Sequence, residues 1–338
     1  MCQTDEFLQV LRRNGHVHDP QARLAPMPGG VSSEIYLVED GARKFVVKRA
    51  LARLKVKDDW FADVSRNRSE RDYLECVGRM MPGAVPQLYF SSDDAGYFGM
   101  EYLGKDFLSW KHMLLAGEFS ASHAQLAGQI LGEIHRRTAG DEGLHKKFDT
   151  TQNFHQLRVE PYLLTTGKRH PALRALFDAE ARRIESTREA LVHGDFSPKN
   201  ILIRGDRLVL LDCEVAWYGD PVFDVAFFLN HLFLKSLHHA PRSSGANKMM
   251  AAFWRAYARE RSAAEALTIE KRLVPLLLML LLARVDGKSP VEYLAAPRQE
   301  FIRTFVGKHL PSPPKNLAAL REIWFEQILA SESIEAHA

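Results

Sequence analysis

The segment 191–224 constrains this chain most, because acidic, amide and histidine side chains gather there between short apolar runs. Asp195 and Asn200 lie five residues apart in a loop that also contains Gly194 and Pro198. Glycine and proline in this arrangement disfavour a regular helix or strand. The side chains of Asp195 and Asn200 can therefore face the same pocket.

A β-hairpin is predicted directly after this loop. Two short aliphatic runs, 201–203 and 208–211, flank the turn 204–207, whose sequence is Arg-Gly-Asp-Arg. The central Gly-Asp pair suits a hairpin turn. The hairpin is expected to return Asp212 to the side of Asn200.

The residues at the end of this hairpin have the chemistry of a divalent-cation site. Asp212, Glu214 and Asn200 offer hard oxygen ligands. Such ligands suit Mg²⁺ rather than zinc, and they leave coordination positions for substrate phosphates. Asp195 then remains as the group that faces a nucleophile.

Two motifs in this segment resemble the aminoglycoside phosphotransferase and choline kinase superfamily. HGDFSPKN at 193–200 is similar to the catalytic loop of that superfamily, and Asp212 followed by GDPVFD at 219–224 matches its metal-binding segment. The resemblance implies an α+β, bilobal protein-kinase-like fold, with a small antiparallel β-sheet N-lobe and a larger, mostly α-helical C-lobe. It also implies ATP and Mg²⁺ as cofactors, and transfer of the γ-phosphoryl group to a hydroxyl of a small molecule.

The resemblance assigns roles to matching positions. It makes Asp195 the catalytic aspartate, and Asn200 and Asp212 the magnesium ligands. His193 is then expected to brace the loop. An ordinary β-hairpin with a polar turn is the alternative, but several spaced elements agree here.

Two positions depart from the protein-kinase pattern. Ser197 stands where protein kinases have a lysine two residues after the catalytic aspartate, so a positive charge must come from Lys199 or elsewhere. The usual D-F-G is replaced by Asp212-Cys213-Glu214. This D-x-E pattern resembles the methylthioribose kinase branch, where the glutamate also serves the metal.

Asp220 and Asp224 favour structural roles at least as much as catalytic ones. Asp220 is followed by Pro221 and an apolar run, which is a good helix N-cap and first turn. Asp224 is expected to brace the loop.

A glycine-containing loop between two predicted strands is a candidate nucleotide-binding element. Gly29 and Gly30 allow backbone amides to approach phosphate oxygens, and Ser32 and Ser33 add hydroxyl donors. A simple hairpin is the alternative, since no G-x-G-x-x-G is present.

Lys48 ends the next predicted strand. In the resembling family this lysine grips the α and β phosphates of the nucleotide, which makes it the expected phosphate contact here. A helix predicted at 66–79 carries Glu70, the expected partner that aligns Lys48. Asp72 and Glu75 on the same helix are alternatives.

Strands predicted at 85–89 and 97–103 complete an antiparallel sheet of about five strands. The segment 100–104 is expected to be the hinge. The resemblance implies that main-chain groups of Glu101 and Leu103 bond the adenine ring; a linker without adenine contact is the alternative.

The hinge divides the chain into an expected nucleotide-binding lobe, 1–103, and a catalytic and substrate-binding lobe, 104–338. Helices are predicted in the second lobe at 123–137, 171–190, 222–238, 245–259, 269–284, 291–308 and 316–331. Arg158, in an aromatic-rich segment, and Arg284, at the end of the apolar run 273–283, are candidate substrate contacts. A cleft-facing arginine can hold a carboxylate or phosphate through two hydrogen bonds.

The acceptor is expected to be a neutral or anionic small hydroxylated metabolite, such as a sugar or polyol, because aminoglycosides are polycations that need an acidic cleft. Pairing of Arg284 with Asp286 or Glu292 is the structural alternative. An aminoglycoside kinase and a catalytically silent nucleotide-binding scaffold remain alternative functions.

The composition is that of an ordinary globular enzyme. The net charge of +3 arises from 45 basic and 42 acidic residues, so neither a nucleic-acid partner nor a polybasic tail is expected. Three scattered cysteines without C-x-x-C spacing favour a reducing, cytoplasmic location. The run 273–283 contains Pro275 and is shorter than the roughly 20 residues of a membrane span, so no membrane association is expected.

Overall fold

The computed structural model describes residues 3–27, 33–50 and 65–335, and the chain divides into two compact units. Unit 1 is Met1–Phe107 with Val209–Glu214, and unit 2 is Leu108–Leu208 with Val215–Ala338. The short segment with Asp212 therefore folds with unit 1, although the sequence suggests one boundary near Gly104.

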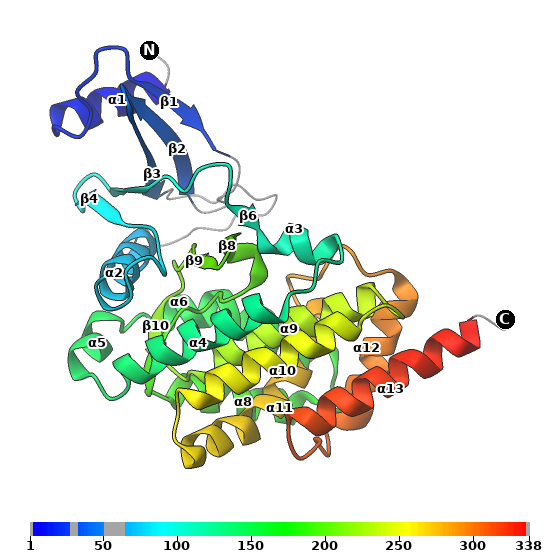
Figure 1. Ribbon diagram of the computed structural model, residues 1–338. Helices are drawn as coiled ribbons and strands as arrows, with labels where there is room; N and C mark the ends of the chain where they lie inside the picture. The colour runs from blue at the N-terminus through cyan, green and yellow to red at the C-terminus, as the bar shows by residue number, and fades with distance from the viewer. Residues whose placement is uncertain (1–2, 28–32, 51–64, 336–338) are drawn as a thin grey trace. The chain divides into compact units, whose positions relative to one another are not determined.

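Unit 1 is built on an antiparallel sheet (Figure 1). Its elements are α1 (Gln3–Arg13), β1 (Arg23–Pro26), β2 (Ser33–Asp40), β3 (Arg43–Ala50), α2 (Ser65–Met80), β4 (Leu88–Ser92) and β5 (Tyr97–Glu101). The five strands have the order β1-β2-β3-β5-β4, and every pair is antiparallel. The expected sheet of about five strands is confirmed.

The two faces of strand β3 carry different side chains. Successive side chains of a strand point to opposite faces, so Phe45 and Val47 pack into the core with α1 while Lys48 points the other way. Lys48 is nevertheless only 2% exposed. A lysine buried this deeply needs a charge partner, because an isolated buried ammonium is strongly disfavoured.

Unit 2 is mostly helical, as the resemblance implies. Its helices are α3 (Trp110–Leu115), α4 (Ala121–Thr138), α5 (Glu142–Lys147), α6 (Thr151–Phe154), the π-helix η1 (His155–Leu164), α7 (Thr165–Arg169), α8 (Arg174–Ser186), the 3₁₀ turn η2 (Pro198–Asn200), α9 (Val222–His238), α10 (Ser244–Arg259), α11 (Ala263–Asp286), α12 (Ala296–His309) and α13 (Leu317–Glu335). Its short strands are β6 (Leu108–Ser109), β7 (Ala190–Val192), β8 (Ile201–Arg204), β9 (Arg207–Leu210, which ends in unit 1) and β10 (Trp217–Gly219). The predicted hairpin forms as β8 and β9, and the antiparallel sheet of unit 1 with the helices of unit 2 gives the expected α+β class.

Helix α9 forms the centre of unit 2. It packs against α10 and α11, and α4 packs against α10 (Figure 1). Nearly all of its residues are buried, as expected for a helix that is apolar on all sides. The buried exceptions to its apolar character, Asp224, Asn230, Lys235 and Ser236, therefore mark positions with a specific polar task.

The apolar run with Pro275 lies inside α11 and is buried, as predicted. Within the described ranges, no helix has both the length and the apolar character required to cross a bilayer.

Candidate active site

The loop 193–200 follows β7, and one buried carboxylate accepts hydrogen bonds from the start of its backbone. Asp224 is fully buried in the first turn of α9, and its oxygens accept hydrogen bonds from the backbone N–H of His193 (2.7 Å) and of Gly194 (2.9 Å). The ring of His135 contacts the same carboxylate at 3.3 Å, and burial lowers the pKa of His135. Asp224 thus has the loop-bracing contacts expected from the sequence.

His193 braces the loop from within. Its Nδ1 accepts a hydrogen bond from the backbone N–H of Asp195 at 3.2 Å, so the ring of His193 holds the backbone of Asp195. The side chain is 1% exposed and packs edge-on against Phe196. Its position matches the expected brace.

Gly194 allows the chain to turn sharply before Asp195. Its φ is +77°, a conformation that side chains disfavour. A Cβ at this position would also lie 2.5 Å from the carbonyl oxygen of Val215. Both the backbone angle and the close approach require glycine.

We expect Gly194→Ala to lower the free energy of unfolding by about 1–3 kcal/mol from the strained backbone alone, and by more because of the contact with Val215. Gly205→Ala is the matched control, since Gly205 has a φ of +55° and open space around it. Thermal denaturation of both variants measures the difference. Equal losses would show that the close approach carries no cost.

Asp195 is surrounded by donors. One carboxylate oxygen, Oδ2, accepts from Asn200 Nδ2 at 2.8 Å, and lies 3.2 Å from Arg158 Nη2 and 3.4 Å from Lys199 Nζ. Asn200 also donates to the backbone carbonyl of Asp195 at 3.1 Å. With its amide nitrogen used in this way, Asn200 presents its remaining oxygen as the group that can bind a cation.

Arg158 places a positive charge beside Asp195. It lies in the π-helix η1, a form of helix that is frequent at functional sites. Its guanidinium donates to the carbonyl of Gly194 at 2.5 Å as well as pairing with Asp195. Arg158, which the sequence suggests as a substrate contact, is thus bonded to the catalytic loop itself.

Unit 1 contains a second charged group, centred on Lys48. Its Nζ lies 2.5 Å from Glu70 and 3.0 Å from Asp212, and the side chains of Lys48 and Glu70 are each 3% exposed. Burial works against the ammonium, but the carboxylates of Glu70 and Asp212 outweigh it and hold the pKa of Lys48 well above its usual value. Burial also raises the pKa of Glu70, to about 7, against the attraction of Lys48.

The structure pairs Lys48 with Glu70 and not with either alternative on α2. Asp72 bonds to Arg71 at 2.7 Å, and Glu75 bonds to Arg79 at 2.5 Å. The predicted register of the helix is therefore the observed one.

Asp212 has an unusual backbone conformation. Its φ is +58°, and it is the one non-glycine residue with a positive φ among those that the structure describes. Strained conformations of this kind concentrate at functional sites. The carboxylate is 34% exposed, so one side of it remains accessible beside Lys48.

The donor set fits a magnesium ion held jointly with a nucleotide. Asp212 lies 3.0 Å from Lys48, and the charge of Glu214 contributes to the raised pKa of the same lysine. Among the residues described, no group of three or more His, Cys, Asp or Glu side chains is arranged to hold a metal alone. Mg²⁺ is commonly bound by one or two carboxylates together with substrate phosphates, so this pair of carboxylates suits it.

The residues expected to contact the nucleotide lie in three places along unit 1. Gly29, Gly30 and Ser32 lie outside the described residues. Ser33 begins β2 and is 4% exposed. Glu101 ends β5, where its backbone N–H donates to the Gln87 carbonyl at 2.8 Å, and Leu103 follows it with 8% exposure. The expected adenine contact of Glu101 and Leu103 stays a prediction.

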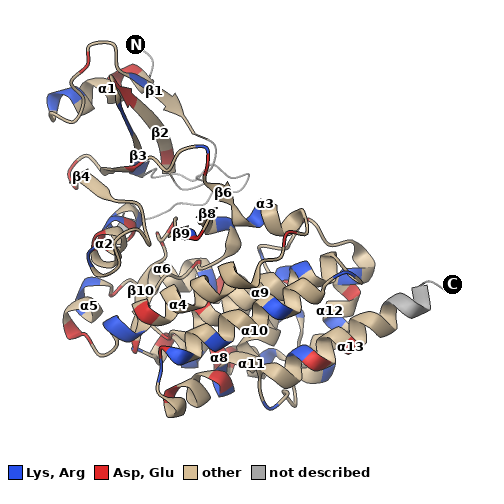
Figure 2. Cartoon of the chain, viewed as in Figure 1, with Lys and Arg blue, Asp and Glu red and all other residues tan. Residues whose placement is uncertain are grey.

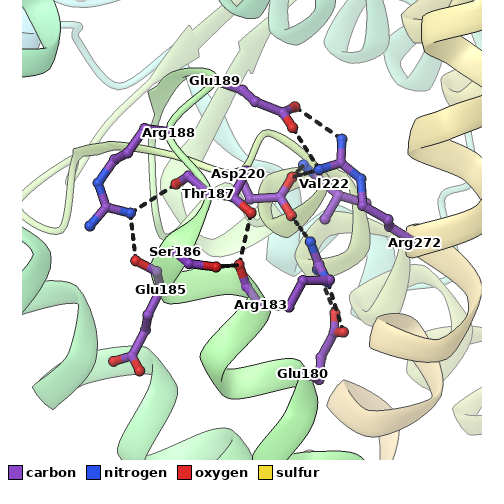
Figure 3. Close-up of polar contacts among 10 residues, drawn as sticks. All are labelled: Glu180, Arg183, Glu185, Ser186, Thr187, Arg188, Glu189, Asp220, Val222 and Arg272. Carbon is purple, nitrogen blue, oxygen red and sulfur yellow. Dashed lines mark hydrogen bonds and ion pairs between the residues drawn. The ribbon is translucent and has the colours of Figure 1, made fainter.

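Asp220 belongs to a separate structural network (Figure 3). It is fully buried, accepts from the backbone N–H of Val222 at 3.0 Å, and pairs with Arg183 and with Arg272, the latter at 3.3 Å. Arg272 also forms two hydrogen bonds to Glu189, at 2.8 and 3.0 Å. These contacts tie α8 and α11 to the start of α9, which is a bracing arrangement.

Arg284 does not form the ion pairs that the structural alternative required. Its guanidinium bonds to the hydroxyl of Tyr162 at 3.2 Å and to Oγ of Ser289 at 2.8 Å. Asp286 instead pairs with Arg303 and His170, each at 2.8 Å. Arg284 is therefore held by neutral groups.

Two further polar residues of α9, His231 and Lys235, were not identified from the sequence. Both interrupt the apolar helix 222–237. A lysine within a helix that is apolar on all sides is itself a signal, because burial of an unpaired charge is costly. This signal was available in the sequence.

Comparison with known proteins identifies phosphotransferases as relatives of this chain. The model of the phosphotransferase enzyme family (APH) matches residues 23–267. A methylthioribose kinase of Yersinia pseudotuberculosis serotype O:1b (strain IP 31758) is 23% identical over 259 residues, which cover 68% of this chain and 63% of that protein. The match thus spans less than two thirds of the length of this relative.

Two solved structures share the fold over most of the chain. An amicoumacin kinase, solved with AMP-PNP, Ca²⁺ and Ami, has a TM-score of 0.55 and 13% identity, and the alignment covers 94% of this chain and 98% of that one. A choline kinase of Cryptosporidium parvum Iowa II has a TM-score of 0.55 and 11% identity, with coverages of 90% and 96%. At these identities the likeness shows the fold alone.

Proposed function

Because this chain belongs to the phosphotransferase enzyme family, we propose that it transfers the γ-phosphoryl group of ATP to a hydroxyl of a small molecule. The observation that carries the proposal is the environment of Asp195. Its carboxylate is held in one orientation by Asn200, Arg158 and Lys199, unlike that of an isolated surface aspartate.

Asp195 acts as the residue that orients the acceptor. Its carboxylate accepts a hydrogen bond from the acceptor hydroxyl and takes the proton as the hydroxyl oxygen attacks the γ-phosphorus. The bond from the γ-phosphorus to the bridging oxygen breaks, and ADP leaves with the electron pair. Arg158 and Lys199 hold positive charge beside a reaction that concentrates negative charge.

Lys48 acts on the nucleotide. Its ammonium binds the α and β phosphates, and Glu70 fixes its direction, as the 2.5 Å contact allows. The raised pKa of Lys48 supports this role, because the lysine stays protonated beside its two carboxylates.

Asp212, Asn200 and Glu214 are the residues that would hold Mg²⁺. When bound, the ion supplies charge neutralisation for the nucleotide phosphates. The protein contributes oxygen atoms of the kind that Mg²⁺ prefers, and the exposed side of Asp212 supports this assignment.

A turnover assay with ATP and Mg²⁺ tests the proposal. The panel consists of methylthioribose, glycerol, glycerate, glycerol 3-phosphate, choline and kanamycin, with ADP production as the measurement. We expect acceptor-dependent ADP production with a neutral or anionic hydroxyl compound and none with the two cations, because the cationic groups beside Asp195 repel positive charge.

Two outcomes would contradict parts of the proposal. Robust phosphorylation of kanamycin, with all sugars and hydroxy acids inert, would show that the acceptor class is wrong. Tight nucleotide binding without phosphoryl transfer to any member of a broad metabolite library would instead indicate a silent scaffold.

A further inference from the structure

Lys235 is a buried lysine that has no carboxylate partner among the described residues. It lies in the last turn of α9 and is 2% exposed. In the part of the chain that the structure describes, it has no hydrogen bond or ion pair. Its Nζ lies over the ring of Tyr293, 5.4 Å from the ring centroid. Such a side chain is unfavourable unless something else compensates its charge.

The surroundings of Lys235 add to the positive charge. Burial, followed by the charges of Arg284 and Lys111, lowers the pKa of Lys235 to about 7. One turn earlier on the same helix, burial and then the charges of Lys235 and Arg284 lower the pKa of His231 far below its usual value. The residues Lys111, Lys235 and Arg284 are hereafter the cationic cluster, which the uncharged ring of His231 adjoins.

The basic residues of the cluster come from three separate helices. Lys111 lies on α3, Lys235 on α9 and Arg284 on α11, and Figure 2 shows Lys and Arg in blue on many helices of unit 2. A solvated charged face of one helix would not have this arrangement. The fold instead lets charges from distant parts of the sequence act on Lys235.

Two carboxylates that lie close in the sequence to Arg284 and to its partner Tyr162 pair with other residues. Asp286 pairs with Arg303 and His170, and Glu160 pairs with Lys288 at 2.7 Å. Nε of Arg284 is buried and has no hydrogen-bond partner among the described residues. Within the described ranges, neither Lys235 nor Arg284 therefore has a carboxylate partner.

A continuous series of contacts within unit 2 connects the cluster to Asp195. Arg158, which pairs with Asp195, lies over the rings of Phe227 (5.6 Å) and Tyr162 (5.9 Å). The ring of Phe227 then meets that of His231 at 5.3 Å, and the hydroxyl of Tyr162 bonds to Arg284. Aromatic side chains thus link Arg158, beside Asp195, to the cluster.

We propose that the cationic cluster binds an anionic group, a carboxylate or a phosphate, carried by the same acceptor whose hydroxyl faces Asp195. This inference rests on the proposed function and narrows it from a neutral or anionic acceptor to an anionic one. Arginine and lysine are the usual partners of both groups, and a guanidinium can bind either through two parallel hydrogen bonds. The same charges exclude polycationic acceptors by repulsion.

Anion binding tests the inference without requiring the true acceptor. The full chain is first saturated with Mg²⁺ and AMP-PNP, so that the nucleotide-phosphate site is occupied. Inorganic phosphate and acetate are then titrated separately by calorimetry. We expect at least one of them to bind with a Kd of about 1 mM or tighter, and the tighter of the two identifies the group.

Lys235→Met removes the central charge and keeps a long apolar side chain. We expect this variant to bind the anion about tenfold more weakly or worse, since a charge-assisted contact is lost. Because the variant also removes an unpaired buried charge, its Tm without anion should equal or exceed that of the wild type. A loss of binding can then be separated from a failure to fold.

Lys308→Met is the matched control, because Lys308 is an exposed lysine of α12 and the change in net charge is the same. It should bind the anion as the wild type does. The inference is overturned if neither anion binds to the nucleotide-loaded protein, or if Lys235→Met and the wild type bind equally.

Failure of this inference can be distinguished from failure of the proposed function. If Mg²⁺ and AMP-PNP bind but neither anion does, the kinase assignment stands and the anionic acceptor is rejected. If AMP-PNP does not bind, the proposed function fails, and phosphate is titrated into the unloaded protein. Binding that depends on Lys235 would then still support an anion site.

Discussion

Replacement of Asp195 by asparagine is expected to abolish phosphoryl transfer while nucleotide binding persists. The amide has nearly the same shape as the carboxylate but cannot take the proton of the acceptor hydroxyl. Loss of such a group typically costs about 10²- to 10⁴-fold in rate. Initial rates of ADP production, measured with the best acceptor of the panel, report the effect, and calorimetry with Mg²⁺ and AMP-PNP reports nucleotide binding.

Asp206→Asn is the matched control for Asp195→Asn. Asp206 lies in the exposed turn between β8 and β9, so the same chemical change occurs in unit 2 without touching the catalytic loop. Its rate should equal that of the wild type. Wild-type turnover in Asp195→Asn would show that another residue accepts the proton.

The fold and the catalytic loop were largely predictable, because both depend on local sequence. A glycine before Asp195, a hairpin turn after Asn200 and alternation in β3 are each specified by a few adjacent residues. The partner of Lys48 was also predictable, since helical periodicity limits the candidates on α2 to residues on its inner face. Buried helices follow from apolar composition in the same way.

The partners of the isolated arginines and lysines were not predictable. Arg158 pairs with a residue 37 positions later in the sequence, and nothing local to η1 specifies that contact. Arg284 has an acidic residue two positions away, but a separation of two places side chains on different faces of a helix, and Arg303 takes that carboxylate instead. Such pairings depend on how helices pack, which single-sequence patterns do not determine.

The cationic cluster illustrates both cases. Lys235 can be recognised in the sequence as a charge inside an apolar helix, and that pattern alone predicts an unusual environment. The action of Lys111 and Arg284 on the pKa of Lys235 depends on how the helices of unit 2 pack. The position of an unusual buried lysine was therefore predictable, whereas the charges that act on it were not.

Replacement of Asp212 by asparagine is expected to remove most of the effect of Mg²⁺ on nucleotide binding. Asparagine suits this position because, like aspartate, it tolerates the positive φ of +58°. The substitution therefore changes the charge with little added strain. Lys48 keeps its contact with Glu70, so the phosphate-binding ammonium stays in place.

The test is a calorimetric titration of AMP-PNP at increasing Mg²⁺ concentrations. Wild-type affinity should rise with Mg²⁺, and the variant should lose about tenfold or more at saturating Mg²⁺, as expected when a contact to a charged group is removed. Asp94→Asn, at an exposed position in the turn between β4 and β5, makes the same change away from Lys48 and should behave as the wild type. An unchanged Mg²⁺ dependence in Asp212→Asn would place the metal on other residues, and Glu214→Gln is then the next variant to measure, because Glu214 is the second carboxylate that acts on Glu70.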